Sequence, residues 1–141
     1  MDERAEPIGR DEYVKRIADL CARGGRHPVP RRARDRAILL HVLARSFAGG
    51  AEHTEKQVDA RIQRWLLQTG RALETDHVSL RRALIDDGFL AREPRGSAYR
   101  SSTKYKGLWT FDPAVFGVDP DAVVAEAQAQ AAERKRLARK K

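Results

Sequence analysis

Residues 75–100 restrict the fold more than any other stretch, because they combine a helix, a glycine stop and two short strands. Asp76 or Thr75 begins the helix and Gly88 ends it. An apolar run from Phe89 follows, and the turn residues at 94–96 separate it from a second strand at 98–100. A helix followed by a two-stranded wing is the recognition unit of a winged helix-turn-helix.

Two amphipathic helices precede this unit. Residues 31–47 present one apolar face, and in residues 54–67 Thr54 and Gln57 have the spacing of a capping box. The connection 68–75 is longer than a tight helix-turn-helix uses. The apolar face of the first helix comprises Ile38, Leu39, Val42, Leu43 and Phe47, and that of the second comprises Val58, Ile62, Trp65 and Leu66.

Both flanks also predict helices. Asp11 can cap a short helix that ends before Gly24 and Gly25, and two prolines then form a stiff connector. Leu108, Trp109 and Phe111 are expected to dock a C-terminal extension, and Asp119-Pro120 begins an alanine-rich helix with a basic end. We therefore expect a mainly α fold with a small antiparallel β wing. Its parts are an accessory helix and linker (1–27), a winged-helix-like domain (28–111) and a C-terminal helix (112–141).

The charge distribution favours a polyanionic partner. The 141 residues include 28 Lys and Arg against 20 Asp and Glu, a net charge of +8. Most of the excess lies in the predicted domain: nine basic against five acidic residues in 31–75, and seven against four in 76–110. Phosphate backbones bind such surfaces with release of counterions, so we expect nucleic acid as the partner.

The predicted helix after Asp76 carries adjacent arginines that cannot point the same way, because successive residues are 100° apart. Arg82 shares its face with Ser79 and Asp86. Arg81 falls within the apolar arc, so we expect it to pack its stem on the core and pair with Asp76 or Asp86, although a phosphate contact is the alternative. Ser79 and Arg82 are thus the candidates for contact with base edges.

Further basic residues are candidates for contacts with the backbone of nucleic acid. Arg95 lies at the expected wing tip, where a solvated hairpin is the equal alternative. Asp86 and Asp87 weaken the hypothesis of nucleic-acid binding, because two carboxylates at the end of a recognition helix repel phosphates. The remaining candidates are Arg32, Arg36, Arg61, Arg64, Arg100, Lys104 and Lys106.

No motif predicts an enzyme, a cofactor, a metal site or a small-molecule effector. The four histidines lack the spacing of zinc ligands, and Cys21 has no catalytic signature around it. Glu55 and Asp59 could bind a cation, but a solvated helix face explains them more simply. A single cysteine, a polar N-terminus and no long apolar run predict a cytoplasmic protein without a signal peptide or membrane span.

The pattern D-x-x-x-L-R-R-x-L-I-D-x-G-x-L-x-R-x-x-x-G-x-x-Y runs from Asp76 to Tyr99. With the helix that ends at Phe47 and the segment His53-Thr54-Glu55, it makes residues 28–100 resemble a bacterial winged-helix-like family, catalogued as domain of unknown function number two thousand and eighty-seven. Members occur alone or joined to helix-turn-helix sensors of the ArsR type. The resemblance therefore implies a link to transcriptional regulation.

Three hypotheses follow from the sequence. The first is a regulator that binds double-stranded DNA through the helix after Asp76 and the wing. The second is a protein-interaction module, for example a homodimer formed through the wing or the Trp109 region, since folds of this type are reused freely. The third is RNA binding through Lys104, Tyr105 and Lys106.

Overall fold

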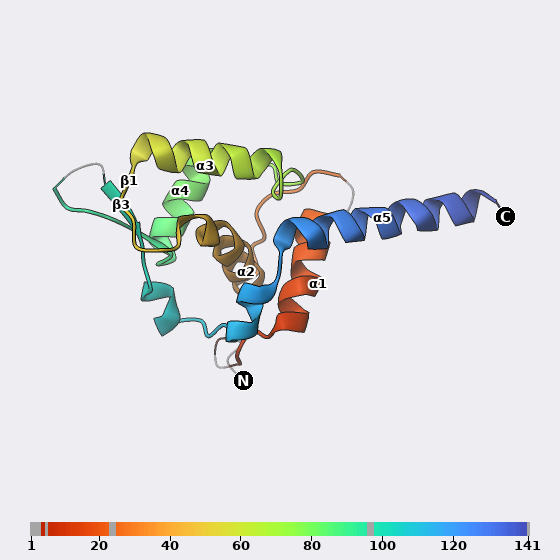
Figure 1. Ribbon diagram of the computed structural model, residues 1–141, viewed down its shortest axis with the longest axis horizontal. Helices are drawn as coiled ribbons and strands as arrows, with labels where there is room; N and C mark the ends of the chain where they lie inside the picture. The colour runs from red at the N-terminus through yellow and green to blue at the C-terminus, as the bar shows by residue number, and fades with distance from the viewer. Residues whose placement is uncertain (1–3, 5, 23–24, 96–97, 141) are drawn as a thin grey trace.

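The computed structural model describes residues 4, 6–22, 25–95 and 98–140 and shows a mainly helical protein with a small antiparallel sheet (Figure 1). Its elements, in chain order, are α1 (Arg10–Cys21), α2 (Ala33–Ala44), η2 (Arg45–Phe47), β1 (His53–Thr54), α3 (Glu55–Leu67), α4 (His77–Asp86), β2 (Leu90–Arg92), β3 (Ala98–Ser101), η3 (Lys104–Gly107), η4 (Pro113–Gly117) and α5 (Pro120–Arg139).

The three strands form one sheet in the order β1-β3-β2. Tyr99 of the central strand is paired with His53 on one side and Arg92 on the other. The sequence does not predict β1, because two residues are too few to show an alternating pattern. The capping box of Thr54 and Gln57, by contrast, is confirmed. The order α2, β1, α3, α4, β2, β3 is compatible with a winged helix.

Helix α2 is the centre of the fold. All seven residues 37–43 are buried, so the helix has no solvated face along this stretch. The sequence therefore predicts too narrow a buried surface for this helix. Leu40 and His41 lie outside the expected apolar face and are nevertheless only 0% and 3% exposed. The reason is tertiary, because α1 contacts α2 on one side, α4 contacts it on another, and the C-terminal segment packs around His41.

Helix α1 belongs to the same hydrophobic core rather than to a separate accessory unit. Tyr13 and Ile17 are fully buried in one cluster with α2 and with residues of the C-terminal segment. The helix begins at Arg10 with Gly9 in the cap position, and Asp11 lies in the first turn. The expected cap at Asp11 is thus wrong by two positions, and Arg23 and Gly24 lie outside the described part of the chain.

Two bidentate ion pairs join α1 to the start of α2. Arg34 donates from Nε and Nη2 to the Glu12 carboxylate at 2.6 and 2.7 Å. Arg16 donates to both oxygens of Asp35 at 2.9 and 3.0 Å. Arg34 and Asp35 are 6% and 7% exposed, so each buried charge on α2 is neutralised by an opposite charge on α1. The pairs fix the two helices in one register.

The segment after the wing closes the core from the other side. Ile8 and Phe111 form a parallel bridge, and Phe111 stacks on His41 with the ring centroids 3.9 Å apart. Burial lowers the pKa of His41 to about 4, so its ring is neutral at physiological pH. Trp109 is buried as expected, but Leu108 is 46% exposed and does not take part in the docking.

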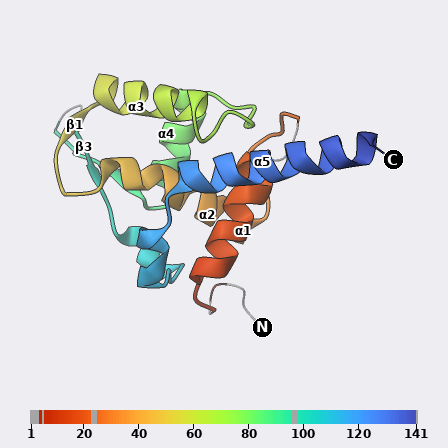
Figure 2. The ribbon, with the colours of Figure 1, turned by 45° about the vertical axis from the view of Figure 1, so that its right-hand side comes forward.

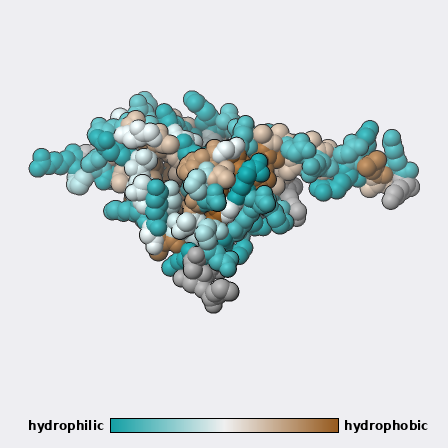
Figure 3. Space-filling model, turned by 60° about the horizontal axis from the view of Figure 1, so that its bottom comes forward, coloured by the Kyte–Doolittle hydropathy of each residue, from teal (hydrophilic) through white to brown (hydrophobic). Residues whose placement is uncertain are grey.

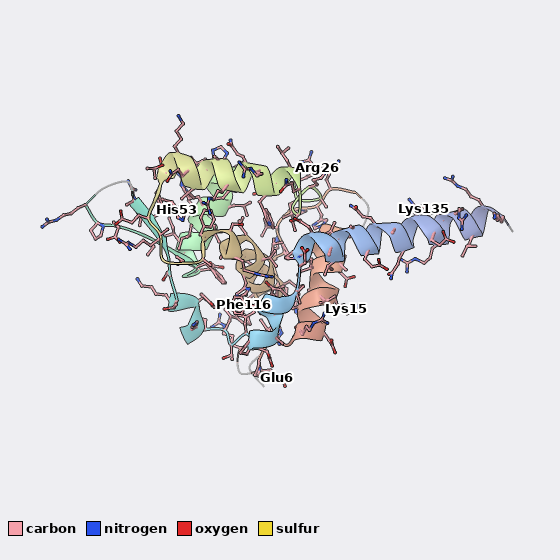
Figure 4. The ribbon with its side chains drawn as sticks, viewed as in Figure 1. Glu6, Lys15, Arg26, His53, Phe116 and Lys135 are labelled. Atoms are coloured by element: carbon pink, nitrogen blue, oxygen red, sulfur yellow. The ribbon has the colours of Figure 1, made fainter. Side chains whose placement is uncertain are left out.

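Helix α5 begins with Asp119 and Pro120 as the sequence predicts, and the Asp119 side chain accepts hydrogen bonds from two backbone amides of the first turn. Its first half packs on α1, whereas its second half projects from the rest of the molecule (Figures 1 and 2). The projecting part is largely hydrophilic (Figure 3) and carries Lys135 (Figure 4). Val124 is the residue of this helix that the core buries.

Gly88 ends α4 and directs the chain into the wing. Its φ is +85°, which residues with a side chain rarely adopt, and an added Cβ would lie 2.7 Å from the backbone nitrogen of Tyr105. This close approach lets η3 pack against the end of α4, where the Tyr105 amide donates to the Gly88 carbonyl at 3.1 Å. The glycine is therefore required both by its torsion angle and by its surroundings.

Replacing Gly88 with Ala should lower the free energy of unfolding by about 2 kcal/mol or more, because strain and overlap add. Gly107→Ala is the matched control, since an added Cβ there has nothing within 4 Å. Urea denaturation of both variants measures the difference. Equal stability of the two variants would contradict the role assigned to Gly88.

The Arg34–Glu12 pair should make stability depend on pH. The hydrogen bond from Arg34 lowers the pKa of Glu12 below its ordinary value of 4.5, so the pair stabilises the fold above that value and its contribution is lost as the pH falls through the lowered pKa. Glu12→Gln should cost about 2 kcal/mol at neutral pH, and the difference from the wild type should shrink below pH 4.5.

Unfolding by urea at a series of pH values tests this dependence. Asp11→Asn is the control, because the Asp11 side chain is fully exposed and its loss should leave the pH profile of the wild type unchanged. A constant difference between the wild type and Glu12→Gln at every pH would show that the ion pair does not carry the effect.

Candidate nucleic-acid interface

Helix α4 presents a polar face that is open to solvent. Asp76 caps the helix by accepting a hydrogen bond from the Ser79 amide at 2.7 Å, and this bond lowers the pKa of the Asp76 carboxyl. Leu80 and Leu84 are buried against the core, which leaves Ser79, Arg82 and Asp86 on the exposed side. The Ser79 hydroxyl also donates to Asp76, at 3.2 Å, so it is partly engaged in the cap.

Arg81 points the other way, into an acidic cluster between α4 and α3. Its guanidinium binds Asp59 directly and lies 3.7 Å from Glu55, so its partners belong to α3 and not to α4 itself. From the sequence, Asp76 or Asp86 is the expected partner of Arg81, and neither forms an ion pair with Arg81. The Tyr99 hydroxyl donates to Glu55 at 2.7 Å, and together with Arg81 it lowers the pKa of Glu55. The Glu55 and Asp59 pair thus holds an arginine of the protein and ties the wing to α3.

Arg36 is tied to the end of α4. Its guanidinium donates to both oxygens of Asp87 at 2.8 and 3.1 Å, which leaves it less available for a phosphate. The same pair neutralises the charge of Asp87, which is one of the two carboxylates that would repel a phosphate at this end of the helix. Asp86 stays exposed. Arg32 lies 3.4 Å from Asp35, so it also has an acidic neighbour.

Two of the candidate arginines, Arg95 and Arg100, lie in the wing and differ in their contacts with the described residues. Arg100 binds Glu52 and Glu93, and its Nη1 donates to the Gly50 carbonyl at 3.2 Å. These contacts hold β3 to the loop before β1. Arg95 lies in the turn, is exposed, and forms no hydrogen bond or ion pair with the described residues. Gly96, which the sequence assigns to the same turn, lies outside the described residues.

Lys104 and Lys106 lie in η3, which packs against the end of α4 through the close approach at Gly88. Both are exposed, and neither forms an ion pair within the part of the chain described. Tyr105 between them points inward and stacks on Phe89 with the ring centroids 4.6 Å apart. Its ring is therefore occupied and is a poor platform for a base.

Arg61 and Arg64 lie on a different side of the molecule. Residues 59 and 63 of α3 contact α4, through Arg81 and His77 respectively. Arg61 is two residues from Asp59 and so is turned by about 200° from it. The two arginines consequently do not share a surface with Arg82. Arg61 donates to the Ser46 carbonyl, whereas Arg64 is exposed and makes no polar contact with described residues.

The structure therefore separates the ten candidate contacts into groups that the sequence could not distinguish. Three arginines are engaged by carboxylates, namely Arg32, Arg36 and Arg100. Those near α4 and the wing without such partners among the described residues are Arg82, Arg95, Lys104 and Lys106. Ser79 is on the same face as Arg82, and Arg61 and Arg64 are on another.

Among the described residues, no group of three or more His, Cys, Asp or Glu side chains is arranged to hold a metal ion. Cys21 is buried, and burial raises the pKa of its thiol to about 12, so it is a poor nucleophile. No helix in the described ranges is both long enough and apolar enough to cross a bilayer.

Residues 27–101 match the profile of a protein family described as "Uncharacterized protein conserved in bacteria (DUF2087)". The match begins at the residue before Pro28 and ends with β3, so it covers α2 to the wing and excludes α1 and α5. No curated protein and no solved structure matches the chain.

The two adjacent arginines of α4 should contribute differently to the free energy of unfolding. Arg81→Ala should lower the free energy of unfolding by about 2–3 kcal/mol, since it leaves the Asp59 carboxylate half-buried without its partner. Arg82→Ala should change it by about 0.5 kcal/mol or less, because the side chain is exposed. Thermal and urea unfolding of the two variants give the comparison, and equal losses would contradict the assigned orientations.

Proposed function

The chain belongs to this bacterial family, and we propose that it is a winged-helix protein that binds double-stranded DNA and acts in transcriptional regulation. The supporting observation is the exposed face of α4, where Arg82 has no partner among the described residues and lies next to Ser79. Helix α4 takes the place of a recognition helix, which enters the major groove with its polar side chains towards base edges.

The wing and η3 provide the backbone contacts in this proposal. Arg95 meets the backbone or the minor groove from the turn of the wing, and Lys104 and Lys106 meet phosphates near the end of α4. The Arg36–Asp87 pair supports the assignment, because it reduces the negative charge at that end. A cytoplasmic location goes with this function.

The alternative interfaces find less support. Trp109 is 6% exposed, which leaves little surface for a dimer formed around it. Tyr105 is partly buried and one face of its ring is stacked on Phe89, so that face is not available for stacking on an RNA base. DNA binding through α4 and the wing uses side chains that are already exposed.

Fluorescence anisotropy with a labelled duplex of random sequence, measured across a salt series, tests the proposal. The wild type should bind at low salt and weaken steeply as the salt rises, with a log–log slope that reports the number of phosphate contacts. Arg82→Ala with Arg95→Ala should weaken binding about tenfold or more and make the slope shallower.

The matched control is a double variant, Arg71→Ala with Arg134→Ala. It removes the same charge from exposed positions, one after α3 and one on the second half of α5. It should retain most of the affinity. Absence of binding at low salt, or an equal loss in both double variants, would overturn the proposed interface.

A further inference from the structure

A pocket of about 450 Å³ lies between the end of α2, the second half of α3 and the start of α5. Its walls combine apolar and basic side chains, and the C-terminal helix closes one side. The Thr69 hydroxyl donates to Asp121, which ties the end of α3 to the first turn of α5 at the pocket. The lining residues used below are Val42, Arg45, Arg61, Arg64, Trp65 and Asp121.

The pocket is separate from the proposed DNA-binding face. Asp59 and Gln63 form the side of α3 that contacts α4. Arg61 and Arg64 are turned by about 200° and 140° from Asp59 on the helix, so they face away from α4. A ligand in the pocket would therefore contact α2, α3 and α5 without touching Arg82.

The lining has an excess of positive charge. Three arginines and one aspartate are among the lining residues, and the Asp121 carboxylate already accepts a hydrogen bond from Thr69. Arg64 makes no hydrogen bond or ion pair with described residues. Arg61 and Arg45 each donate to one backbone carbonyl, and their guanidinium groups lie over the rings of Phe47 and Phe116 at 5.8 and 5.9 Å from the centroids. The donors left for a ligand are therefore those of Arg64 and the remaining N–H groups of Arg61, and the net charge of the lining matches a dianion.

The apolar part of the wall is well fixed. Trp65 is 7% exposed, and its ring packs directly over Gly70, where an added Cβ would overlap the ring. Val42 belongs to the buried centre of α2 and is 4% exposed. Because both side chains are largely buried, they give the pocket only a narrow apolar edge beside the arginines.

We propose that this pocket binds a small phosphate monoester. Arg61 and Arg64 bind the phosphate dianion, since the planar guanidinium fork matches its oxygens. Arg45 adds positive charge from the end of α2. The organic part of the ligand packs beside Val42 and Trp65. The ligand connects the family-matched part of the chain to α5, which the match does not cover.

Isothermal titration of the full chain with phenyl phosphate and with inorganic phosphate, in a buffer of low ionic strength, tests the site. Phenyl phosphate should bind more tightly than inorganic phosphate, because it also fills the apolar edge. In the nitrogen–proton NMR spectrum, the Nε–Hε signals of Arg61 and Arg64 should shift on titration. Arg64→Gln should weaken binding about tenfold, and since the side chain is exposed and has no polar partner among the described residues, the substitution should leave the fold intact.

Arg71→Gln is the matched control, because it removes a nearby exposed arginine that does not line the pocket. It should bind phenyl phosphate as the wild type does. The proposal is overturned if the wild type gives neither heat nor shifts, if Arg64→Gln binds unchanged, or if Arg71→Gln weakens binding equally.

Phosphate groups also occur in the backbone of DNA, so a second arm separates the two sources. Duplex binding by Arg64→Gln should equal that of the wild type, and phenyl phosphate should not compete with the duplex. A large loss of duplex affinity in Arg64→Gln would assign the pocket to DNA and overturn the small-ligand proposal. Titration with phenyl phosphate uses no DNA, so its outcome does not depend on the proposed function.

Discussion

The burial of α2 on every side is the constraint on which the rest of the structure depends. A helix without a solvated face needs neighbours all round, and here α1, α4 and the segment around Phe111 supply them. Its first turns carry the charges of Arg34 and Asp35 into the interior, where an unpaired charge would be strongly destabilising. The reciprocal pairs with α1 remove that cost. The family-matched residues 27–101 therefore share one core with both flanks.

Ion pairing also distinguishes the basic side chains that hold the fold together from those that can bind a partner. Arg81 is bound by α3, Arg36 by Asp87 and Arg100 by Glu52 and Glu93, and each of these pairs connects two elements. Four candidate cations without partners among the described residues, namely Arg82, Arg95, Lys104 and Lys106, lie instead on α4, the wing and η3. A chain with net charge +8 thus uses part of its basic residues to hold α4 and the sheet in place. The four candidate cations near α4 and the wing form the surface proposed for DNA.

Local patterns in the sequence predict much of this fold. Capping residues locate the starts of α3, α4 and α5, because a cap and the amides that it binds are only a few residues apart. The helical wheel of α4 correctly assigns Leu80 and Leu84 to the core and leaves Arg82 exposed. These features depend on near neighbours in the chain, so a single sequence contains them.

Contacts between distant residues could not be predicted in the same way. Arg36 and Asp87 are 51 positions apart, and nothing near either residue indicates the other. The two-residue strand β1 is visible only through its partner β3, and the complete burial of α2 depends on flanks outside the predicted domain. For the same reason the sequence groups Arg61 and Arg64 with Arg82, although α3 turns them to another side.

In the proposed complex, DNA contacts the cations of α4 and the wing that have no partner among the described residues, and not the cations held in ion pairs. Titrating labelled protein with a short DNA duplex while recording arginine side-chain NMR signals tests this arrangement most directly. The signals of Arg82 and Arg95 should shift first, while those of Arg36, Arg81 and Arg100 should keep their positions. Shifts confined to α5, or no shifts at low salt, would contradict it.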